Sequence, residues 1–317
     1  MRKRIDIIKM LKWAIVAAIF ALLGEMVRDN WNEVKDASFT FRFFPFICGT
    51  FVFILSSFIQ LGAWYLITAR LGIALSFRET LGSWFYSQLG KYLPGKVWLL
   101  VSRFYFYESK GKSKKTVSVA LYFETVTIIA TAGFLSWASL LVFQGALPYD
   151  LGGQTGWLAL FFIPVFVFLH PRVLQKLLNG VLRRLNREPI VLSLSYGDVL
   201  WILSVCLISW VVGGIGFYLF IDSVYSVPAG SVLYLTGALA FSSILGLIAL
   251  FAPGGLGVRE GALVYLLSFT MPGSVAVVLS VLTRLWMTLI EIGLIGVVYL
   301  VSRFRIRPKE KDPYAQG

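Results

Sequence analysis

The chain has 317 residues, of which 58% are hydrophobic and only 14% are charged, and its mean hydropathy is +0.79. This composition excludes an ordinary water-soluble domain and predicts an all-α polytopic membrane protein. The formal net charge of +13 fits Lys- and Arg-rich cytoplasmic loops, so we expect no nucleic-acid partner. The single histidine and the two cysteines, both within apolar runs, predict neither a metal site nor a cofactor.

Apolar runs predict about six spanning helices, since a hydrocarbon core needs about 20 residues. The first run, residues 13–24, follows a basic N-terminus without a clear cleavage pattern, so we expect it to remain as a span. The other predicted spans are 43–69, 116–143, 157–170, 196–221 and 274–302.

Two less regular regions, residues 76–107 and 231–270, each carry a Pro-Gly break, in KYLPGKVW and APGGLG. Lys and Arg gather at the N-terminus, on both sides of the first region, in the segment after residue 171 and in the tail. These segments, and so both termini, should be cytoplasmic. The charge pattern then predicts that each region enters and leaves on one side, as two opposed re-entrant helical hairpins.

This topology predicts an inverted repeat in the cytoplasmic (inner) membrane. The first membrane repeat is residues 1–143 and the second is 157–302, followed by a cytoplasmic basic tail, 303–317. An amphipathic, basic segment at 171–190 links the halves as an interfacial helix or serves only to anchor the topology. Whether 231–270 is re-entrant or fully spanning stays open at this stage.

Interrupted helices at matching positions of two inverted halves are typical of a transport site near the midplane. A helix that restarts after a break presents free amides and a partial positive charge, which favour an anionic head group. The alternative is that Pro and Gly only turn the hairpins. The predicted substrate-binding residues are Lys91, Pro94, Gly95, Lys96, Arg103, Pro253, Gly254, Gly255, Arg259 and Glu260.

Charges within the predicted spans form a second group, because intramembrane charges are costly and usually paired. Glu124 lies inside the span before the middle of the chain, and Arg284 and Glu291 share one face of the last span. We expect Glu124 and Arg284 to compensate each other across the repeat interface, either as a fixed pair or as a switch. Glu260 is expected to hold Arg259 in place or to exchange partners with it during the transport cycle.

Four motifs, QLGKYLPGKVWLLVSR, LYFETV, APGGLGVREGAL and LTRLWMTLIEIGL, carry a family resemblance over nearly the whole chain. The chain resembles the flippase-like transmembrane domain of lysylphosphatidylglycerol synthases, and in the first motif Trp98 stands where a glycine often appears. In fused members this domain is thought to move aminoacylated phospholipid between leaflets, and an aminoacyl-transferase domain follows it. The resemblance implies a stand-alone member that moves phospholipids or polyprenyl-linked glycans and does not synthesise lipid.

The leading hypothesis is translocation of an anionic phospholipid or a polyprenyl-phosphate-linked lipid, without enzymatic activity. A rival is a polyprenyl-phosphate-sugar transferase whose base is Asp29, Glu33 or Asp36 in an outer loop. Another is a non-transporting assembly partner in envelope polysaccharide synthesis. A lipid-modifying or glycan-synthesis enzyme is a possible partner under these hypotheses, and the sequence does not define the cargo, direction, energy coupling or oligomeric state.

Overall fold

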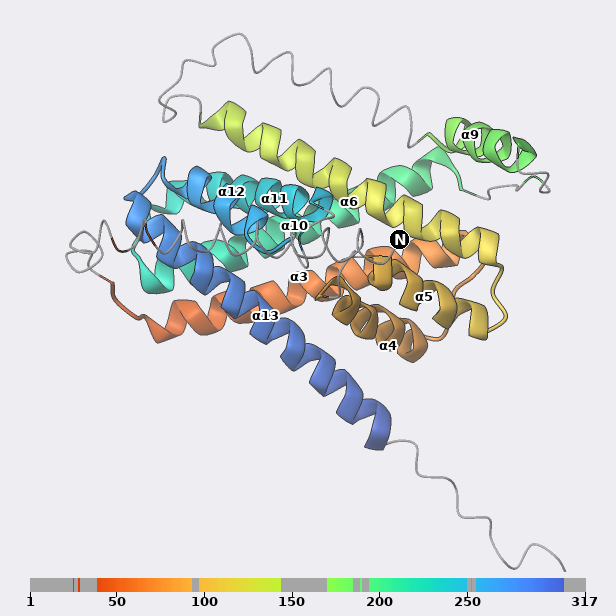
Figure 1. Ribbon diagram of the computed structural model, residues 1–317, viewed down its shortest axis with the longest axis horizontal. Coiled ribbons are helices and arrows are strands. Elements are labelled where there is room, and N and C mark those ends of the chain that lie inside the picture. Colours follow the sequence, from red (N-terminus) through yellow and green to blue (C-terminus); the bar gives the residue numbers. More distant parts are fainter. Residues whose placement is uncertain are drawn as a thin grey trace, which may run out of the picture.

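The computed structural model describes residues 39–92, 97–143, 170–184, 194–249 and 255–304, and the single positions Glu25, Arg28, Pro189 and Ala252 (Figure 1). These residues form helices and no strand. Five of the described helices are long and apolar enough to cross a membrane. The protein is therefore an all-α polytopic membrane protein, which confirms the class predicted from composition.

The long helices match four of the predicted spans to within a few residues, because continuous apolar runs are the dominant signal in this chain. The predicted spans 13–24 and 157–170 fall outside the described residues, apart from His170. The long helices are α3 (Phe43–Arg70), α6 (Lys114–Val142), α10 (Tyr196–Val224), α11 (Val232–Ile248) and α13 (Gly273–Phe304).

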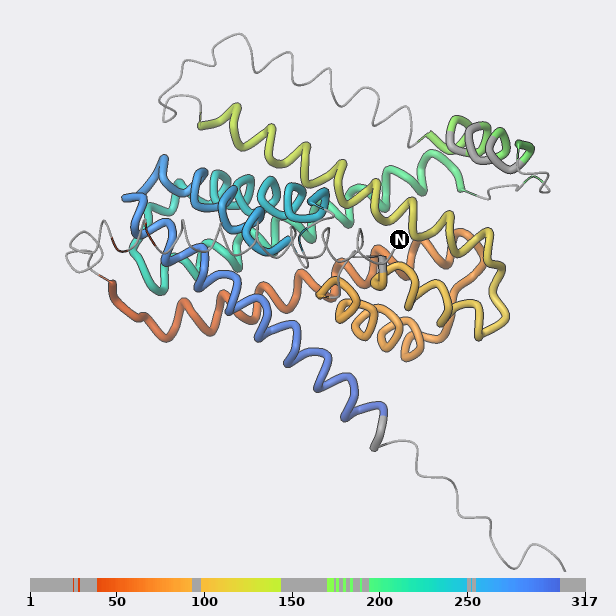
Figure 2. The backbone as a smooth tube through the Cα atoms, in the orientation of Figure 1, coloured from red at the N-terminus to blue at the C-terminus, as the bar shows by residue number. Residues whose placement is uncertain are grey.

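Helices α3 and α10 lie side by side and run antiparallel along the long axis of the molecule (Figure 2). An ion pair joins them at each end. Arg42 lies 2.7 Å from Asp222 at one end, and Arg70 lies 3.0 Å from Asp198 at the other. The first residues of α3 therefore meet the last residues of α10, as expected for corresponding helices of two inverted halves.

Small residues let the backbones of α3 and α10 approach closely. A Cβ atom added to Gly49 would lie 2.8 Å from the Gly216 carbonyl oxygen, which is closer than real contacts allow. Nearer the middle, the Ser209 hydroxyl donates to the Ser56 carbonyl at 2.9 Å. Apolar side chains gain little by associating within lipid, so close packing and interhelical hydrogen bonds hold this pair.

Two helix pairs, each formed by one interrupted region of the sequence, lie toward opposite ends of the molecule (Figure 1). Helix α4 (Phe77–Gln88) continues through a 3₁₀ turn, η1 (Leu89–Tyr92), and packs against α5 (Val97–Ser109). Helix α11 packs against α12 (Val258–Leu267). These pairs occupy the two interrupted regions of the sequence, and their re-entrant position in a bilayer stays a prediction.

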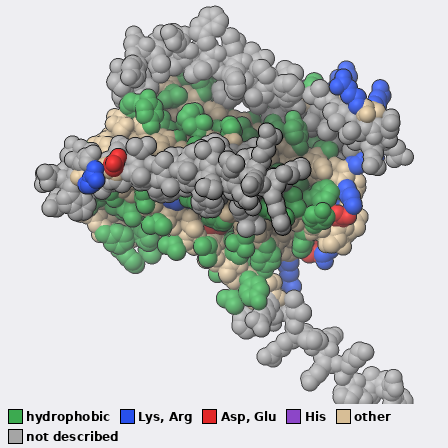
Figure 3. All heavy atoms as spheres, in the orientation of Figure 1, with side chains coloured by type: hydrophobic (Ala, Val, Ile, Leu, Met, Phe, Trp, Pro, Cys, Tyr) green, Lys and Arg blue, Asp and Glu red, His purple; other side chains and the backbone are tan. Residues whose placement is uncertain are grey.

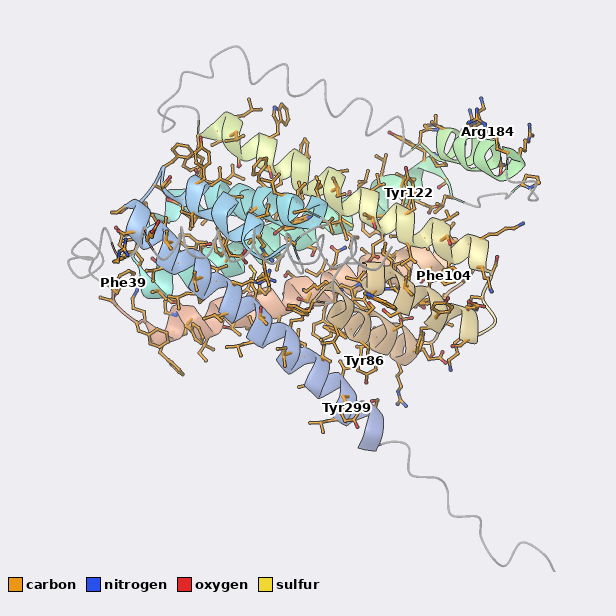
Figure 4. All side chains as sticks on the ribbon, viewed as in Figure 1. Phe39, Tyr86, Phe104, Tyr122, Arg184 and Tyr299 are labelled. Atoms are coloured by element: carbon orange, nitrogen blue, oxygen red, sulfur yellow. The ribbon has the colours of Figure 1, made fainter. Side chains whose placement is uncertain are left out.

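The last long helix of each half packs against the other half. Helix α6 packs on α11, where the Phe143 and Tyr234 rings are 5.1 Å apart. Helix α13 packs on α4, where the Tyr86 hydroxyl lies 3.1 Å from Ser302 (Tyr86 is labelled in Figure 4). In both contacts, the C-terminal part of a long helix packs against the first helix of the other half's interrupted region. The two halves therefore contact each other in the same way.

Helix α9 (Pro171–Arg184) lies apart from the bundle, beside the start of α10 (Figure 1). The His170 ring stacks on Tyr196 with 5.2 Å between ring centroids. Lys and Arg side chains stand out on the outer surface of this helix (Figure 3), and Arg184 is labelled on it in Figure 4. This position suits the predicted interfacial helix, which stays a prediction.

Candidate functional site

The centre of the bundle contains a cavity of about 300 Å³. Helices α3, α4, α6, α10, α11, α12 and α13 and the turn η1 all contribute to its wall. The volume is at the lower end of the range for ligand sites, about 300–1,000 Å³. The polar and charged side chains in the wall are Ser56, Ser57, Gln60, Gln88, Lys91, Ser209, Ser243, Arg259 and Glu291, with the indole of Trp210.

Glu291, on α13, receives two donors from the first interrupted region. Lys91 Nζ lies 2.5 Å from Glu291 Oε2, and the Tyr92 hydroxyl donates to the same oxygen at 2.8 Å. The other carboxylate oxygen, Oε1, is buried and has no hydrogen-bond partner in the part of the chain that the structure describes. The turn after α4 is thus fastened to the other half of the protein at the edge of the cavity.

Arg259 reaches the cavity from the first turn of α12. Its Nη2 lies 2.8 Å from the Met287 sulfur, and no described carboxylate oxygen lies within 4.0 Å of its guanidinium. A cation at the positive end of a helix is also disfavoured by the helix dipole. Lys91, from the other interrupted region, lies near enough to repel it. Arg259 is therefore a half-buried cation without an ion-pair partner among the described residues.

Glycines place Arg259 by letting the chain after the break approach α11. Gly255 has φ of +73°, which suits glycine, and an added Cβ would lie 2.8 Å from the Gly246 backbone. A Cβ on Gly246 would in turn lie 3.0 Å from Arg259 Cβ. The APGGLG segment thus needs at least Gly255 for its backbone conformation. The close contact between Gly246 and Arg259 fixes where the Arg259 side chain begins.

Glu260 does not hold Arg259, contrary to the expected pairing. Its carboxylate accepts the Gly257 N–H at 2.6 Å, which caps α12, and Glu260 Oε1 lies 3.5 Å from Arg284 Nε. The Ser280 hydroxyl donates to the Glu260 carbonyl at 3.1 Å, which ties α12 to α13. Glu260 is only 2% exposed, so it compensates Arg284 inside the protein beside the cavity.

Glu124 pairs with Arg103, and the predicted Glu124–Arg284 pair is wrong. Arg103 Nη1 lies 2.5 Å from Glu124 Oε2, and both side chains are almost completely buried. Ser87 accepts two further hydrogen bonds from the guanidinium, at 3.0 and 3.2 Å. The guanidinium also lies over the Trp64 ring, 4.5 Å from its centroid. The Arg103 guanidinium thus makes its contacts with Glu124, Ser87 and the aromatic rings around them, and it does not line the cavity.

The structure therefore divides the predicted site residues into three groups. Lys91, Arg259 and Glu291 come together at the cavity, although they lie far apart in the sequence. Arg103 and Glu124 form a sealed pair behind it, and Glu260 and Arg284 form a looser pair beside it. Gly255 shapes the turn before α12, and the other five predicted residues, Pro94, Gly95, Lys96, Pro253 and Gly254, lie outside the described residues.

Several uncharged polar residues in the cavity wall were missed by the sequence reading. Ser56 and Gln60 lie one helical turn apart on α3, and Ser209 and Trp210 lie opposite them on α10. An amide in an otherwise apolar run, with a hydroxyl one turn away on the same face, is the signal that would have found the first two. The indole Nε1 of Trp210 is buried and has no hydrogen-bond partner among the described residues.

Fold and cavity together define a polytopic α-helical membrane protein with a cavity that is lined by several of its helices and contains charged side chains. The chain belongs to the family of the lysylphosphatidylglycerol synthase TM region, whose model matches residues 9–296. Membership links the chain to lipid handling within the membrane. A comparison with curated proteins gave no match.

Proposed function

We propose that the protein translocates a lipid with an anionic head group between the leaflets of the cytoplasmic membrane. The observation that carries the proposal is Arg259. It is a half-buried cation in a cavity to which both interrupted regions contribute, and no described carboxylate forms an ion pair with it. Charge inside a membrane is costly and marks substrate paths. A lipid phosphate would supply the missing negative charge, while the acyl chains stay in the bilayer.

The cavity and the Lys91–Glu291 contact together suggest how access changes. Lys91 and Tyr92 hold the turn after α4 against Glu291 on α13. A phosphate near Arg259 competes with Glu291 for Lys91, because both anions attract the same ammonium group. Release of Lys91 would free the turn from the other half of the protein and open the cavity on that side. Binding and opening are then coupled through one exchanged ion pair.

The proposal includes a non-enzymatic role and cytoplasmic termini. The distribution of Lys and Arg supports the orientation, since cytoplasmic loops carry an excess of these residues. The acids assigned to the rival transferase hypothesis, Asp29, Glu33 and Asp36, lie outside the described residues. That hypothesis makes its own prediction, namely that replacing all three with Asn abolishes cellular function.

The test is lipid translocation in proteoliposomes, with a membrane-impermeant quencher and two fluorescent substrates, phosphatidylglycerol and a polyprenyl phosphate. We expect wild-type protein to move at least one of them. Arg259→Gln should lower the initial rate by about 10- to 100-fold, the value of a hydrogen bond to a charged group. Arg184→Gln removes the same cation from α9, outside the cavity, and should leave the rate unchanged.

Two results would overturn the proposal. One is that neither lipid moves, even with a proton gradient applied, which would give the transferase and assembly-partner hypotheses the lead. The other is equal transport by wild type and Arg259→Gln, which would remove the cavity from the mechanism. A thermal unfolding curve for each variant in detergent separates lost transport from lost folding.

A further inference from the structure

The charge balance of the cavity distinguishes between classes of head group. Three charged side chains line it among the described residues: Lys91, Arg259 and Glu291. Their formal sum is one positive charge. The neighbouring pairs, Arg103–Glu124 and Arg284–Glu260, each cancel internally. Inside a low-dielectric protein, a mismatch of one charge is expensive, so the ligand that fits best carries one negative charge.

Hydrogen bonding in the wall adds a second requirement. The hydroxyls of Ser56, Ser209 and Ser243 each donate their one hydrogen to a backbone carbonyl, at 2.7, 2.9 and 2.7 Å. Each hydroxyl then has only lone pairs left to offer a ligand. Glu291 Oε1 is a further buried acceptor without a partner among the described residues. The wall also holds donors, namely the Trp210 indole N–H, which has no partner among the described residues, and the amides of Gln60 and Gln88. Apart from its cations, the cavity therefore suits hydroxyl groups, which both donate and accept.

We infer that the cavity selects phosphodiester lipids with one negative charge whose head group carries uncharged hydroxyls, such as glycerol or a cyclic polyol. In this arrangement Arg259 binds the phosphate, and Glu291 and the serines accept from the hydroxyls. The inference rests on the proposed function and names its substrate class. It assigns to Glu291 the role of setting the charge that the cavity accepts.

Two other common head groups fit less well because of their charge. A phosphomonoester carries about −1.5 to −2 charges near neutral pH, which leaves the cavity with excess negative charge. A zwitterionic head group such as phosphoethanolamine is neutral overall, so the positive charge of the cavity stays uncompensated, and its cation meets Lys91 and Arg259. The uncharged hydroxyls of a polyol supply the donors without changing the charge.

The test is competitive binding to purified protein in detergent, with a fluorescent short-chain phosphatidylglycerol as the probe. Its competitors are dioctanoyl phosphatidylglycerol, phosphatidylinositol, phosphatidic acid and phosphatidylethanolamine. We expect the first two to displace the probe at concentrations about 10-fold lower than the last two, which corresponds to about 1.4 kcal/mol. Glu291→Gln removes one negative charge and should move phosphatidic acid to the front of the ranking. Glu79→Gln, a matched change outside the cavity, should preserve the wild-type ranking.

The possible outcomes separate the inference from the function on which it rests. Equal displacement by all four lipids overturns the inference, and so does a folded Glu291→Gln variant with the wild-type ranking. If Glu291→Gln does not fold, the wild-type ranking alone decides. Selective binding without translocation in vesicles supports the head-group inference and overturns the proposed transport. Absence of binding by every lipid overturns both.

Discussion

The two buried ion pairs occupy corresponding places in the two halves but are built differently. In each half, the second short helix pairs with the long helix that follows, and the signs are reversed between halves. Arg103 on α5 faces Glu124 on α6 at 2.5 Å, with both side chains almost completely buried. Glu260 on α12 faces Arg284 on α13 at 3.5 Å, and Arg284 is 13% exposed.

The first pair is fully satisfied, whereas the second is not. Besides Arg103, Glu124 accepts the Trp84 indole N–H at 3.3 Å, so both carboxylate oxygens are used. Glu260 Oε1 has no hydrogen bond within the described ranges. One architecture thus provides a fixed ion pair in one half and an adjustable pair in the other. Glu260 of the adjustable pair directly follows Arg259 in the first turn of α12.

Breaking the fixed pair should have the largest effect. Glu124→Gln leaves the Arg103 guanidinium buried without its counter-charge, which costs about 3–5 kcal/mol. We expect a large drop in the unfolding midpoint in detergent and low yield of folded protein. Thermal unfolding and size-exclusion chromatography measure both. A partly exposed pair provides the control, because Glu108→Gln, opposite Lys114, should cost less than about 1 kcal/mol.

The same change in the adjustable pair sharpens the contrast. Glu260→Gln keeps an oxygen that can accept the Gly257 N–H, so we expect a loss of only about 1–2 kcal/mol. Equal losses for Glu124→Gln and Glu260→Gln would mean that the two pairs are equivalent, and the comparison would be wrong.

The second half should instead be sensitive to close packing of α11. A Cβ added to Gly237 would lie 1.8 Å from Ser139 Oγ and 2.4 Å from Ser139 Cβ on α6. Gly237→Ala therefore forces α11 and α6 apart and should cost about 1–3 kcal/mol in the free energy of unfolding.

Two variants control this prediction in the same denaturation assay. Adding Ser139→Gly to Gly237→Ala removes the clashing side chain and should recover most of the loss. Gly261→Ala, on α12, meets nothing within 4 Å and should be neutral or slightly stabilising. Failure of the double variant to recover would show that the glycine acts in some other way than by close contact.

The smallest expected effect on stability concerns Glu79, in the first turn of α4. The Lys110 ammonium, 2.7 Å away, and the Ser76 hydroxyl lower the pKa of Glu79 from 4.5 to about 2. A lowered pKa in the folded state gives stability that is present above the unfolded-state pKa and is lost as the pH falls toward 2.

The measurement is the unfolding midpoint of wild type and Glu79→Gln between pH 7 and pH 3. Wild type should be slightly more stable at pH 7, and the difference should shrink steadily below about pH 4.5. A difference that is constant over this range would mean that the carboxylate contributes no charge-dependent stability.

The sequence predicted well the four spans that the structure describes, but it predicted the charge partners poorly. Continuous apolar runs mark the ends of α3 and α10 directly, since hydropathy depends only on local composition. Partners of buried charges depend on which helices touch. Glu124 was matched to Arg284 by their similar positions in the two halves, but its partner is Arg103, on the helix just before its own. The charge pattern along the chain predicts a repeat, but it does not predict which helices pack together.

The cavity shows the same limit. Lys91, Arg259 and Glu291 could be chosen beforehand because charge within an apolar segment is conspicuous. Ser56 and Trp210 could not, because serines and tryptophans occur throughout membrane helices and only the antiparallel packing of α3 and α10 turns these toward one space. Which donors and acceptors the wall offers depends on hydroxyl hydrogen bonds that the sequence pattern does not predict.

The antiparallel contact of α3 with α10 also has a consequence for biosynthesis. Ser56 and its partner Ser209 are 153 residues apart in the chain. At about 5–20 residues per second, the ribosome needs about 8–30 s to make the intervening segment. During that interval Gly49 and its neighbours on α3 face lipid or the insertion machinery in place of their final partner. The first half must wait in the membrane, incompletely folded, until the second half arrives.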